Sequence, residues 1–250
     1  MLIGTTNFAI LLLFFQRKFR TALRCSELRL MGLLLVILAP LTALSLMSGL
    51  YMRAGEGFRQ AVFNIVSAIS TTGYATMPYA NWPAAAIGMM ILAMLIGGGV
   101  GSTAGGIKLT RSLILLKSAW RQMLRRVLPE HNVSELTYHR AQGKAKIDSD
   151  LATATGGFVV VYLAIFIMGT LLLTVTAGAT LTEAMFEFAS CLSTVGLSIG
   201  ITGPSTANAT LLVEIVGMIL GRLEIYLVLT GVYSAVFLLR HTFFSQKHRG

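Results

Sequence analysis

Long apolar segments alternate with short polar segments along the whole of this chain. No charged side chain occurs between residues 60 and 107 or between residues 151 and 182. About 20 apolar residues suffice for a helix to cross a bilayer, so runs of this length predict an integral membrane protein. We expect full spans over residues 31–52, kinked at Pro40, and over 83–107, 151–177 and 211–239.

Two further apolar segments, 59–70 and 182–193, lie between these spans and are too short to cross a bilayer. We expect each to form a short helix that enters the membrane and turns back. The segment 2–15 is also short and runs into basic residues. We interpret it as the end of a helix that descends to the cytoplasm, and an interfacial amphipathic anchor is the alternative.

Composition supports a membrane protein, and charge sets its orientation. The chain is 55% hydrophobic and 12% charged, about half the charged fraction of a typical globular protein. The net charge of +10 does not indicate nucleic-acid binding, because cytoplasmic loops of membrane proteins carry a basic excess. Of the 20 Lys and Arg residues, 17 fall in segments 17–29, 108–146 and 240–249. Placing these segments in the cytoplasm makes both short helices re-enter from the outer face.

The residues that usually carry catalysis or bind metals are sparse. Cys25 and Cys191 provide neither a disulfide framework nor a metal-ligand spacing. The sequence contains no constellation of a nucleophile and a base that would favour an intramembrane enzyme. We therefore expect neither enzyme activity nor a cofactor.

The two short segments and the turns after them form an internal repeat. Segment 63–74 recurs 123 positions later as segment 186–197, with five of twelve positions identical. One Ser-Thr-x-Gly turn is a weak signal, but two copies between apolar spans are a strong one. The identical pairs are Phe63/Phe186, Ser67/Ser190, Ser70/Ser193, Thr71/Thr194 and Gly73/Gly196.

The repeated turn has the chemistry of a cation site. A dehydrated cation needs oxygen ligands, and rings of backbone carbonyls supply them in potassium-selective filters. Glycine tolerates the positive φ that such a turn requires, and the negative C-terminal end of each short helix favours a cation. Thr71 and Thr194 can add hydroxyl oxygens at the inner mouth. We predict that the turns 70–74 and 193–197 form two quarters of an ion-selectivity filter.

A glycine-rich stretch interrupts the expected span 83–107. Six glycines in ten residues destabilise a helix, since each costs about 1 kcal/mol relative to Ala. Non-helical backbone at membrane depth must be buried in protein or line water. We predict an internal loop that faces a pore, and a glycine-rich helix-packing face is the alternative. The residues concerned are Gly97, Gly98, Gly99, Gly101, Ser102, Thr103, Ala104, Gly105 and Gly106.

Three motifs occur in order along the chain: Ser-Ala-Ile-Ser-Thr-Thr-Gly-Tyr at 67–74, Gly-Ser-Thr-Ala-Gly-Gly-Ile-Lys at 101–108 and Leu-Gly-Arg-Leu-Glu at 220–224. Together they resemble the Trk/Ktr/HKT superfamily of potassium transporters, most closely the C-terminal half of a TrkH-type subunit. The resemblance implies an all-α membrane protein with two repeats of helix, re-entrant pore helix and helix. These repeats would be half of a four-repeat, pseudo-fourfold channel-like fold.

The resemblance also divides the chain into regions. The loop 128–150 is either a contact for a soluble partner or a solvated connector. The expected regions are 1–29, the end of a preceding repeat and a basic loop; 30–127, a third-type repeat; 128–150, a cytoplasmic loop; 151–240, a fourth-type repeat; and 241–250, a basic tail.

The function that the resemblance implies is potassium uptake, with the ion as substrate. The loop 97–106 would act as an intramembrane gate beneath the filter. The resemblance implies that the filter carbonyls come from Thr71, Thr72, Gly73, Tyr74, Thr194, Val195, Gly196 and Leu197. Arg222 lies near the middle of the last expected span, where a charge is costly; we expect it to line the pore as a barrier. An ion pair between Arg222 and a glutamate is the alternative. Val195 and Leu197 depart from the threonine-rich family pattern, which leaves potassium or sodium preference open.

Two repeats supply only half of a pore wall. We expect the missing N-terminal repeats or a second chain to complete it within a lipid bilayer, most simply a bacterial inner membrane. The resemblance further implies a homodimer and a cytoplasmic nucleotide-binding regulatory subunit. Coupling to sodium or protons stays open, and a non-conducting truncated or scaffold subunit is the alternative function.

Overall fold

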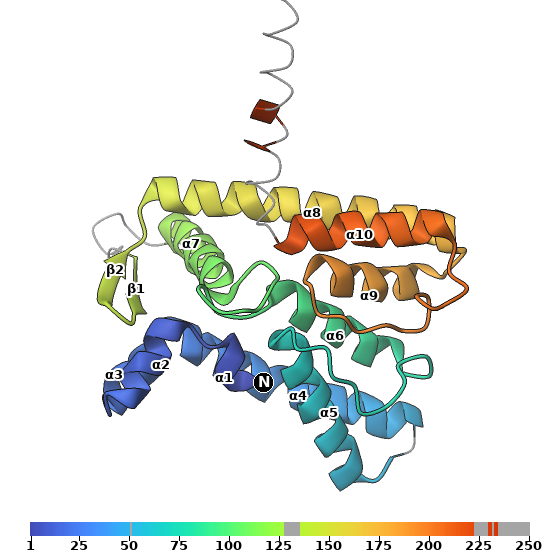
Figure 1. Cartoon of the computed structure of the whole chain (residues 1–250). Coiled ribbons are helices and arrows are strands. Elements are labelled where there is room, and N and C mark those ends of the chain that lie inside the picture. Colours follow the sequence, from blue (N-terminus) through green and yellow to red (C-terminus); the bar gives the residue numbers. More distant parts are fainter. Residues whose placement is uncertain (51, 128–135, 223–229, 232, 235–250) are drawn as a thin grey trace, which may run out of the picture.

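The computed structural model describes residues 1–50, 52–127, 136–222, 230–231 and 233–234, most of them in helices (Figure 1). The helices are α1 (Leu2–Thr5), α2 (Phe8–Phe15), α3 (Phe19–Arg24), α4 (Ser26–Leu50), α5 (Ala54–Ile69), α6 (Ala84–Ile96), α7 (Leu109–Val127), α8 (Ser149–Ala177), α9 (Leu181–Leu192) and α10 (Asn208–Arg222). An antiparallel hairpin of two strands, β1 (Thr137–Arg140) and β2 (Gly143–Lys146), lies between α7 and α8.

One arrangement of helices occurs twice, and the sequence shift of 123 positions relates the two copies. The long helices α4 and α8 begin at Ser26 and Ser149, and the short helices α5 and α9 end at Ile69 and Leu192. The returning helices α6 and α10 begin within one residue of the same shift. This arrangement confirms the expected all-α fold with two repeats of long helix, short helix and returning helix.

The long helix of each repeat has the length and composition of a membrane span. α4 has 25 residues and α8 has 29, and among the described residues these two helices are long and apolar enough to cross a bilayer. Both expose large apolar side chains, including Val36 and Leu44 on α4 and Val160 and Val175 on α8. A surface of this kind suits lipid better than water. Pro40 lies inside α4, which continues as a helix past it.

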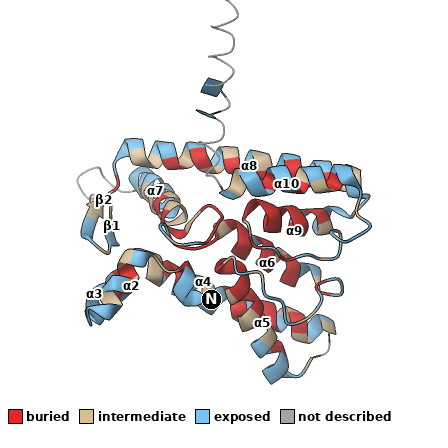
Figure 2. Ribbon diagram, in the orientation of Figure 1, coloured by how far each residue is buried: buried red, intermediate tan, exposed pale blue. Residues whose placement is uncertain are grey.

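The short helices lie at the buried centre of the fold. Figure 2 shows buried residues concentrated on α6, on α9 and at the end of α5. α9 contacts α6, α8 and α10, and every residue from Phe186 to Leu192 is buried. With 16 residues in α5 and 12 in α9, neither helix has the length of a span. The ends of both short helices, from which the two turns begin, are therefore buried.

The short helix that we expected over residues 59–70 begins earlier, at Ala54. Gly57 allows this extension because it lets the first turns of α5 lie directly against α4. A Cβ at Gly57 would be 2.8 Å from Cγ of Met47. Close packing between neighbouring helices thus overrides the helix-breaking tendency of glycine here.

Two other expected helices have different bounds. Segment 2–15 is divided into α1 and α2 at Thr6 and Asn7, and the Asn7 side chain caps α2 by accepting the N–H of Ala9 at 2.9 Å. Of the span expected over 211–239, the structure describes α10 and a few residues beyond it. The remainder of that span, the tail 241–250 and Glu224 lie outside the described residues.

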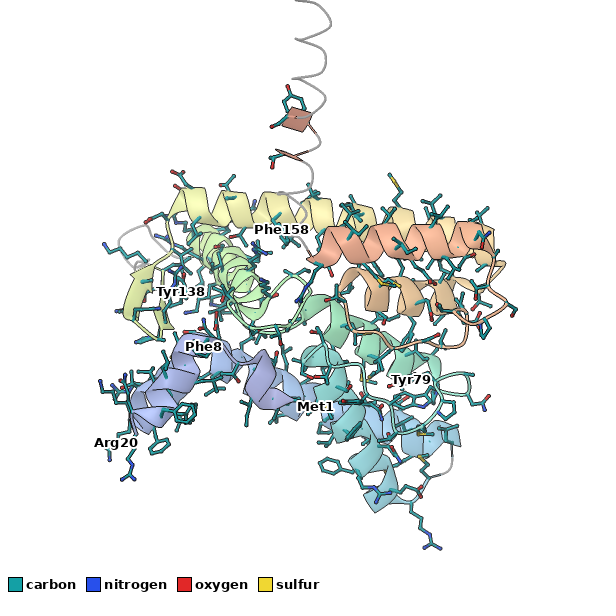
Figure 3. The ribbon with its side chains drawn as sticks, viewed as in Figure 1. Met1, Phe8, Arg20, Tyr79, Tyr138 and Phe158 are labelled. Atoms are coloured by element: carbon teal, nitrogen blue, oxygen red, sulfur yellow. The ribbon has the colours of Figure 1, made fainter. Side chains whose placement is uncertain are left out.

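Part of the expected loop 128–150 is an ordered hairpin rather than a plain polar connector. Tyr138 of β1 is fully buried with Ile114 of α7 and Ile147 (Figure 3). The N–H of His139 donates to Oγ of Ser26 at 3.0 Å, which joins the hairpin to the start of α4. The buried ring of Tyr138 orders this part of the loop, because it gives a short polar segment an apolar side chain to pack against the protein. Residues 128–135 lie outside the described part.

Candidate functional site

The first candidate filter turn closes α5 through left-handed backbone. The N–H of Thr71 donates to the carbonyl of Ala68 at 3.1 Å, and the N–H of Thr72 donates to the carbonyl of Ser67 at 3.0 Å. This pair of bonds is the usual helix ending that places a left-handed residue, most often glycine, after the helix. Here that residue is Thr71, with φ of +49°, and Gly73 follows with φ of +78°.

The second turn repeats these features at the end of α9. The N–H of Thr194 donates to the carbonyl of Cys191 at 3.1 Å, and the N–H of Val195 donates to the carbonyl of Ser190 at 2.9 Å. Thr194 has φ of +53° and Gly196 has φ of +86°. A left-handed threonine costs about 1–2 kcal/mol. Strain of this kind at two equivalent positions is typical of a functional site.

The two turns meet at the centre of the molecule. A Cβ on Gly73 would lie 2.1 Å from the carbonyl oxygen of Val195. A side chain at this position would therefore overlap the backbone of the other turn. The C-terminal ends of α5 and α9 consequently converge on one place, where their negative dipole ends can act on the same ion.

The side chains of the predicted filter residues differ between the turns. Tyr74 is 64% exposed, whereas Val195 and Leu197 are 5% and 4% exposed and belong to the hydrophobic core. The threonine-poor pattern of the second turn thus reflects packing of these two side chains against the protein.

The glycine-rich loop lies against the inner side of both turns. The N–H of Gly105 donates to Oγ1 of Thr71 at 3.1 Å. A Cβ on Gly105 would lie 2.2 Å from the carbonyl oxygen of Ser193 and 2.6 Å from Oγ1 of Thr194. The loop is folded closely on itself as well, since a Cβ on Gly97 would lie 2.1 Å from the carbonyl oxygen of Gly105. Gly97 and Gly105 therefore serve backbone contacts that no larger residue allows.

Two other parts of the chain hold this loop from the sides. The N–H of Gly99 donates to the carbonyl of Thr5 at 3.0 Å, and the hydroxyl of Thr103 donates to the carbonyl of Gly4 at 3.3 Å. On the other side, the Nη1 group of Arg222 donates to the carbonyl of Thr103 at 3.2 Å. The contact with Thr5 was not predicted. In the sequence, only the polar residues between α1 and α2, inside an otherwise apolar segment, indicated this contact.

A brace behind each turn was also missed by the sequence analysis. In the first repeat, Nδ2 of Asn64 donates to Oγ1 of Thr76 at 2.8 Å, and the hydroxyl of Tyr79 donates to Oδ1 of Asn64 at 2.7 Å. Burial raises the pKa of Tyr79, so this hydroxyl keeps its proton. Figure 3 shows Tyr79 in the connection between α5 and α6. The brace ties the chain after the turn back to α5.

The second brace occupies the equivalent positions, 123 residues further along the chain. Glu187 stands where the first repeat has Asn64, and its Oε2 accepts the N–H of Ile199 at 2.9 Å. Its Oε1 accepts the hydroxyl of Thr202. Since Ile199 and Thr202 correspond to Thr76 and Tyr79, the two braces are versions of one device.

Two cavities adjoin the second turn. One, of about 410 Å³, is lined by the turn itself and by α9 and α10. The other, of about 390 Å³, lies on the side of the glycine-rich loop and is lined by residues 102–106 together with Lys108 and Arg111. Thr194 and Arg222 line both cavities. The structure thus places Arg222 beside both the second turn and the glycine-rich loop.

Sequence comparison with known proteins identifies the family of this chain. A family described as a cation transport protein, TrkH, matches residues 2–235. The Trk system potassium uptake protein TrkH of Halomonas elongata is 29% identical over 223 residues, which make up 85% of this chain and 44% of that protein. The Trk system potassium uptake protein TrkG of Escherichia coli K12 is 28% identical over 235 residues, 90% of this chain and 46% of that protein.

A solved structure has the same fold. The crystal structure of the potassium transporter TrkH from Vibrio parahaemolyticus matches with a TM-score of 0.77 and 28% sequence identity, over 92% of this chain and 49% of that one. The chain therefore spans about half the length of these relatives, and its two repeats are half of a four-repeat, channel-like fold. Because the family match extends over almost the whole sequence, this chain belongs to the TrkH family of cation transport proteins, which are integral membrane transporters and not enzymes.

Proposed function

We propose that this chain forms half of the wall of a potassium-conducting pore, and that the complete pore takes up potassium across a bacterial inner membrane. The observation that carries this proposal is the pair of strained turns at the ends of α5 and α9. They have the same hydrogen bonds and the same left-handed residues, and they meet at Gly73 and Val195. Two such turns supply two quarters of a ring of carbonyl ligands.

The ligands in this proposal are backbone oxygens rather than side chains. Residues 71–74 and 194–197 provide them, and Thr71 and Thr194 can add hydroxyl oxygens on the inner side. The helix ends beneath both turns carry partial negative charge, which lowers the energy of a dehydrated cation. Since the side chains of Val195 and Leu197 are buried in the core, the second turn offers backbone oxygens as the first does.

The glycine-rich loop is proposed as the gate. Its contacts with Thr71 and with the carbonyl of Ser193 support a position in the path of an ion that leaves the filter on the inner side. Arg222 holds the loop through Thr103, and its positive charge there would oppose a cation. Movement of the loop away from Thr71 would open the path.

The rest of the pore has to come from elsewhere. Two further repeats, either upstream of this chain or in a second chain, would complete the ring. The relatives are named as parts of a Trk system. Accordingly we propose a homodimer and a cytoplasmic nucleotide-binding regulatory subunit, with the region 128–150 as a contact. The five regions defined from the sequence are the proposed domain organisation.

Growth of a potassium-uptake-deficient bacterium at low potassium tests the function. The chain is expressed alone and joined to an N-terminal half that supplies two more filter repeats, and we expect rescue by the joined form. Gly73→Ala should abolish rescue, because its Cβ would overlap Val195. Gly88→Ala is the matched control, since nothing lies within 4 Å of a Cβ there. Rescue by Gly73→Ala would contradict the proposal. An inserted joined form that does not conduct supports a scaffold subunit instead.

A further inference from the structure

Two buried carboxyl groups behind the second turn lie on one hydroxyl. Glu187 of α9 is 2% exposed and Glu214 of α10 is 1% exposed. Oγ1 of Thr202 is 2.8 Å from Oε1 of Glu214, and it is also within hydrogen-bond distance of Oε1 of Glu187. The second oxygen of Glu187 accepts the N–H of Ile199 at 2.9 Å.

The number of hydrogens in this arrangement decides its charge. An ionised carboxylate can only accept hydrogen bonds, and a threonine hydroxyl has a single hydrogen to donate. With both glutamates ionised, one carboxylate would face a lone pair of Thr202, and two like charges would lie buried beside each other. Both effects are unfavourable. One additional proton removes both, because a protonated carboxyl donates to Oγ1 of Thr202 while the Thr202 hydroxyl donates to the other carboxylate.

The other hydrogen bonds of the two glutamates indicate which of them carries the shared proton. Glu187 accepts two hydrogen bonds, from the N–H of Ile199 and from Thr202, and bonds of this kind favour the ionised form. We propose that Glu214 and Glu187 share one proton through Thr202, with Glu214 protonated and Glu187 ionised, and that this series of hydrogen bonds positions the second filter turn. The inference rests on the proposed function, because it concerns a turn that acts as a filter.

Other titratable groups on the surrounding elements are few in the described part of the chain. Cys191 of α9 and Arg222 of α10 line the same cavity as the two glutamates. Arg222 is directed to the carbonyl of Thr103. On α8, the hydroxyl of Tyr162 is paired with that of Ser193 at 2.9 Å, and the segment that forms α6 contains no titratable residue. The shared proton is therefore the simplest means of limiting the charge at this position.

The first repeat shows why a carboxyl pair is more than a brace. There, the neutral Asn64 performs the same bracing, since it donates to Thr76 and accepts from Tyr79. A neutral amide is thus sufficient to hold a turn. The glutamates add one negative charge, placed behind only one of the two turns, and a proton that can be lost as the pH rises. Both additions act on a cation in the filter.

Infrared difference spectroscopy of the purified chain tests the proton without requiring transport. At neutral pH we expect a carbonyl band of a buried protonated carboxyl group, which Glu214→Gln removes. The control Glu56→Gln changes an exposed residue in the first turn of α5 and should leave the band unchanged. The absence of the band from the unmodified chain, or its persistence in Glu214→Gln, would overturn the shared proton.

The pH profile of ion preference tests the positioning role. In the joined pore, potassium-over-sodium preference should fall as the pH rises, by up to about fivefold, the limit reached if the whole energy of one lost buried hydrogen bond is taken from the preference for potassium. Glu214→Gln cannot lose the proton and still donates to Thr202, so its profile should be flat, whereas Thr202→Val should have the lower preference at every pH. Identical profiles for the unmodified pore and Glu214→Gln would overturn the role. A pore that conducts nothing overturns the proposed function and the positioning role, whereas the infrared band still decides the shared proton.

Discussion

The two repeats agree closely at the turns and differ beneath them. Thr71 and Thr194 have left-handed φ within 4° of each other and the same hydrogen bonds. Below the turns, the first repeat breaks its returning helix after Ile96 into the glycine-rich loop, whereas α10 of the second repeat continues to Arg222. Position 99 is a glycine of the loop, and 123 positions later the residue is Arg222.

This difference separates two structural demands. A ring of ligands requires equivalent units, and a short local motif is enough to build each of them. A gate requires one element that moves and others that hold it, so the repeats cannot all be alike beneath the ring. The comparison therefore supports the proposal that the shared turns form the filter and that the loop, which only one repeat has, acts as the gate.

The largest effect should come from changing equivalent glycines, Gly73 and Gly196. Both have positive φ, but a Cβ at Gly73 would overlap Val195, whereas nothing lies within 4 Å of a Cβ at Gly196. We expect Gly73→Ala to lower the free energy of unfolding by roughly 3 kcal/mol, from strain and overlap together. Gly196→Ala should lower the free energy of unfolding by about 1 kcal/mol, from strain alone. Equal losses in denaturant unfolding in detergent would show that the turns do not meet.

The next effect concerns Arg222, where the repeats differ most. At an effective dielectric constant of about 20, a charge about 10 Å from a cation raises its energy by about 1.7 kcal/mol. We therefore expect Arg222→Ala to increase rubidium flux through the joined pore roughly tenfold, while Arg222→Lys should stay near the original rate. Arg59→Ala, an exposed change on α5, is the control. Unchanged rate and selectivity in Arg222→Ala would exclude a role in the pore.

The smallest effect should distinguish the two left-handed threonines. Replacing either by Gly relieves about 1–2 kcal/mol of strain and costs about 0.4–1 kcal/mol through a more flexible unfolded chain. Thr194→Gly should therefore be stabilising by about 0.5 kcal/mol. Thr71→Gly also loses the bond from the N–H of Gly105, worth about 1 kcal/mol, and should be slightly destabilising. Unfolding midpoints of the two variants measure the difference, and the opposite order would contradict the loop contact.

Local sequence predicted much of this fold and little of what surrounds the turns. Apolar length identified α4 and α8, and the repeated Ser-Thr-x-Gly motif identified both turns, because each of these signals lies within a few residues. The contact between Gly99 and Thr5 joins residues more than 90 positions apart, and no local pattern encodes it. The hairpin depends on the burial of Tyr138 against α7, which composition alone does not reveal.

The brace at Glu187 was missed for a different reason. Its position in the repeat was visible, as was the corresponding Asn64, but its chemistry depends on Thr202 and Glu214. A single glutamate in a short apolar helix does not disclose what its oxygens bind. The partners become apparent only when the turn folds back over α9 and meets α10.

The bond between the N–H of Gly105 and Oγ1 of Thr71 has a consequence for how the proposed pore responds to its own substrate. While the loop occupies this oxygen, an ion at the innermost position must compete with an amide for the same lone pairs. Ion occupancy and closure then oppose each other, and linkage requires each to weaken the other by the same factor. Rising potassium at the inner mouth would by itself favour the open state.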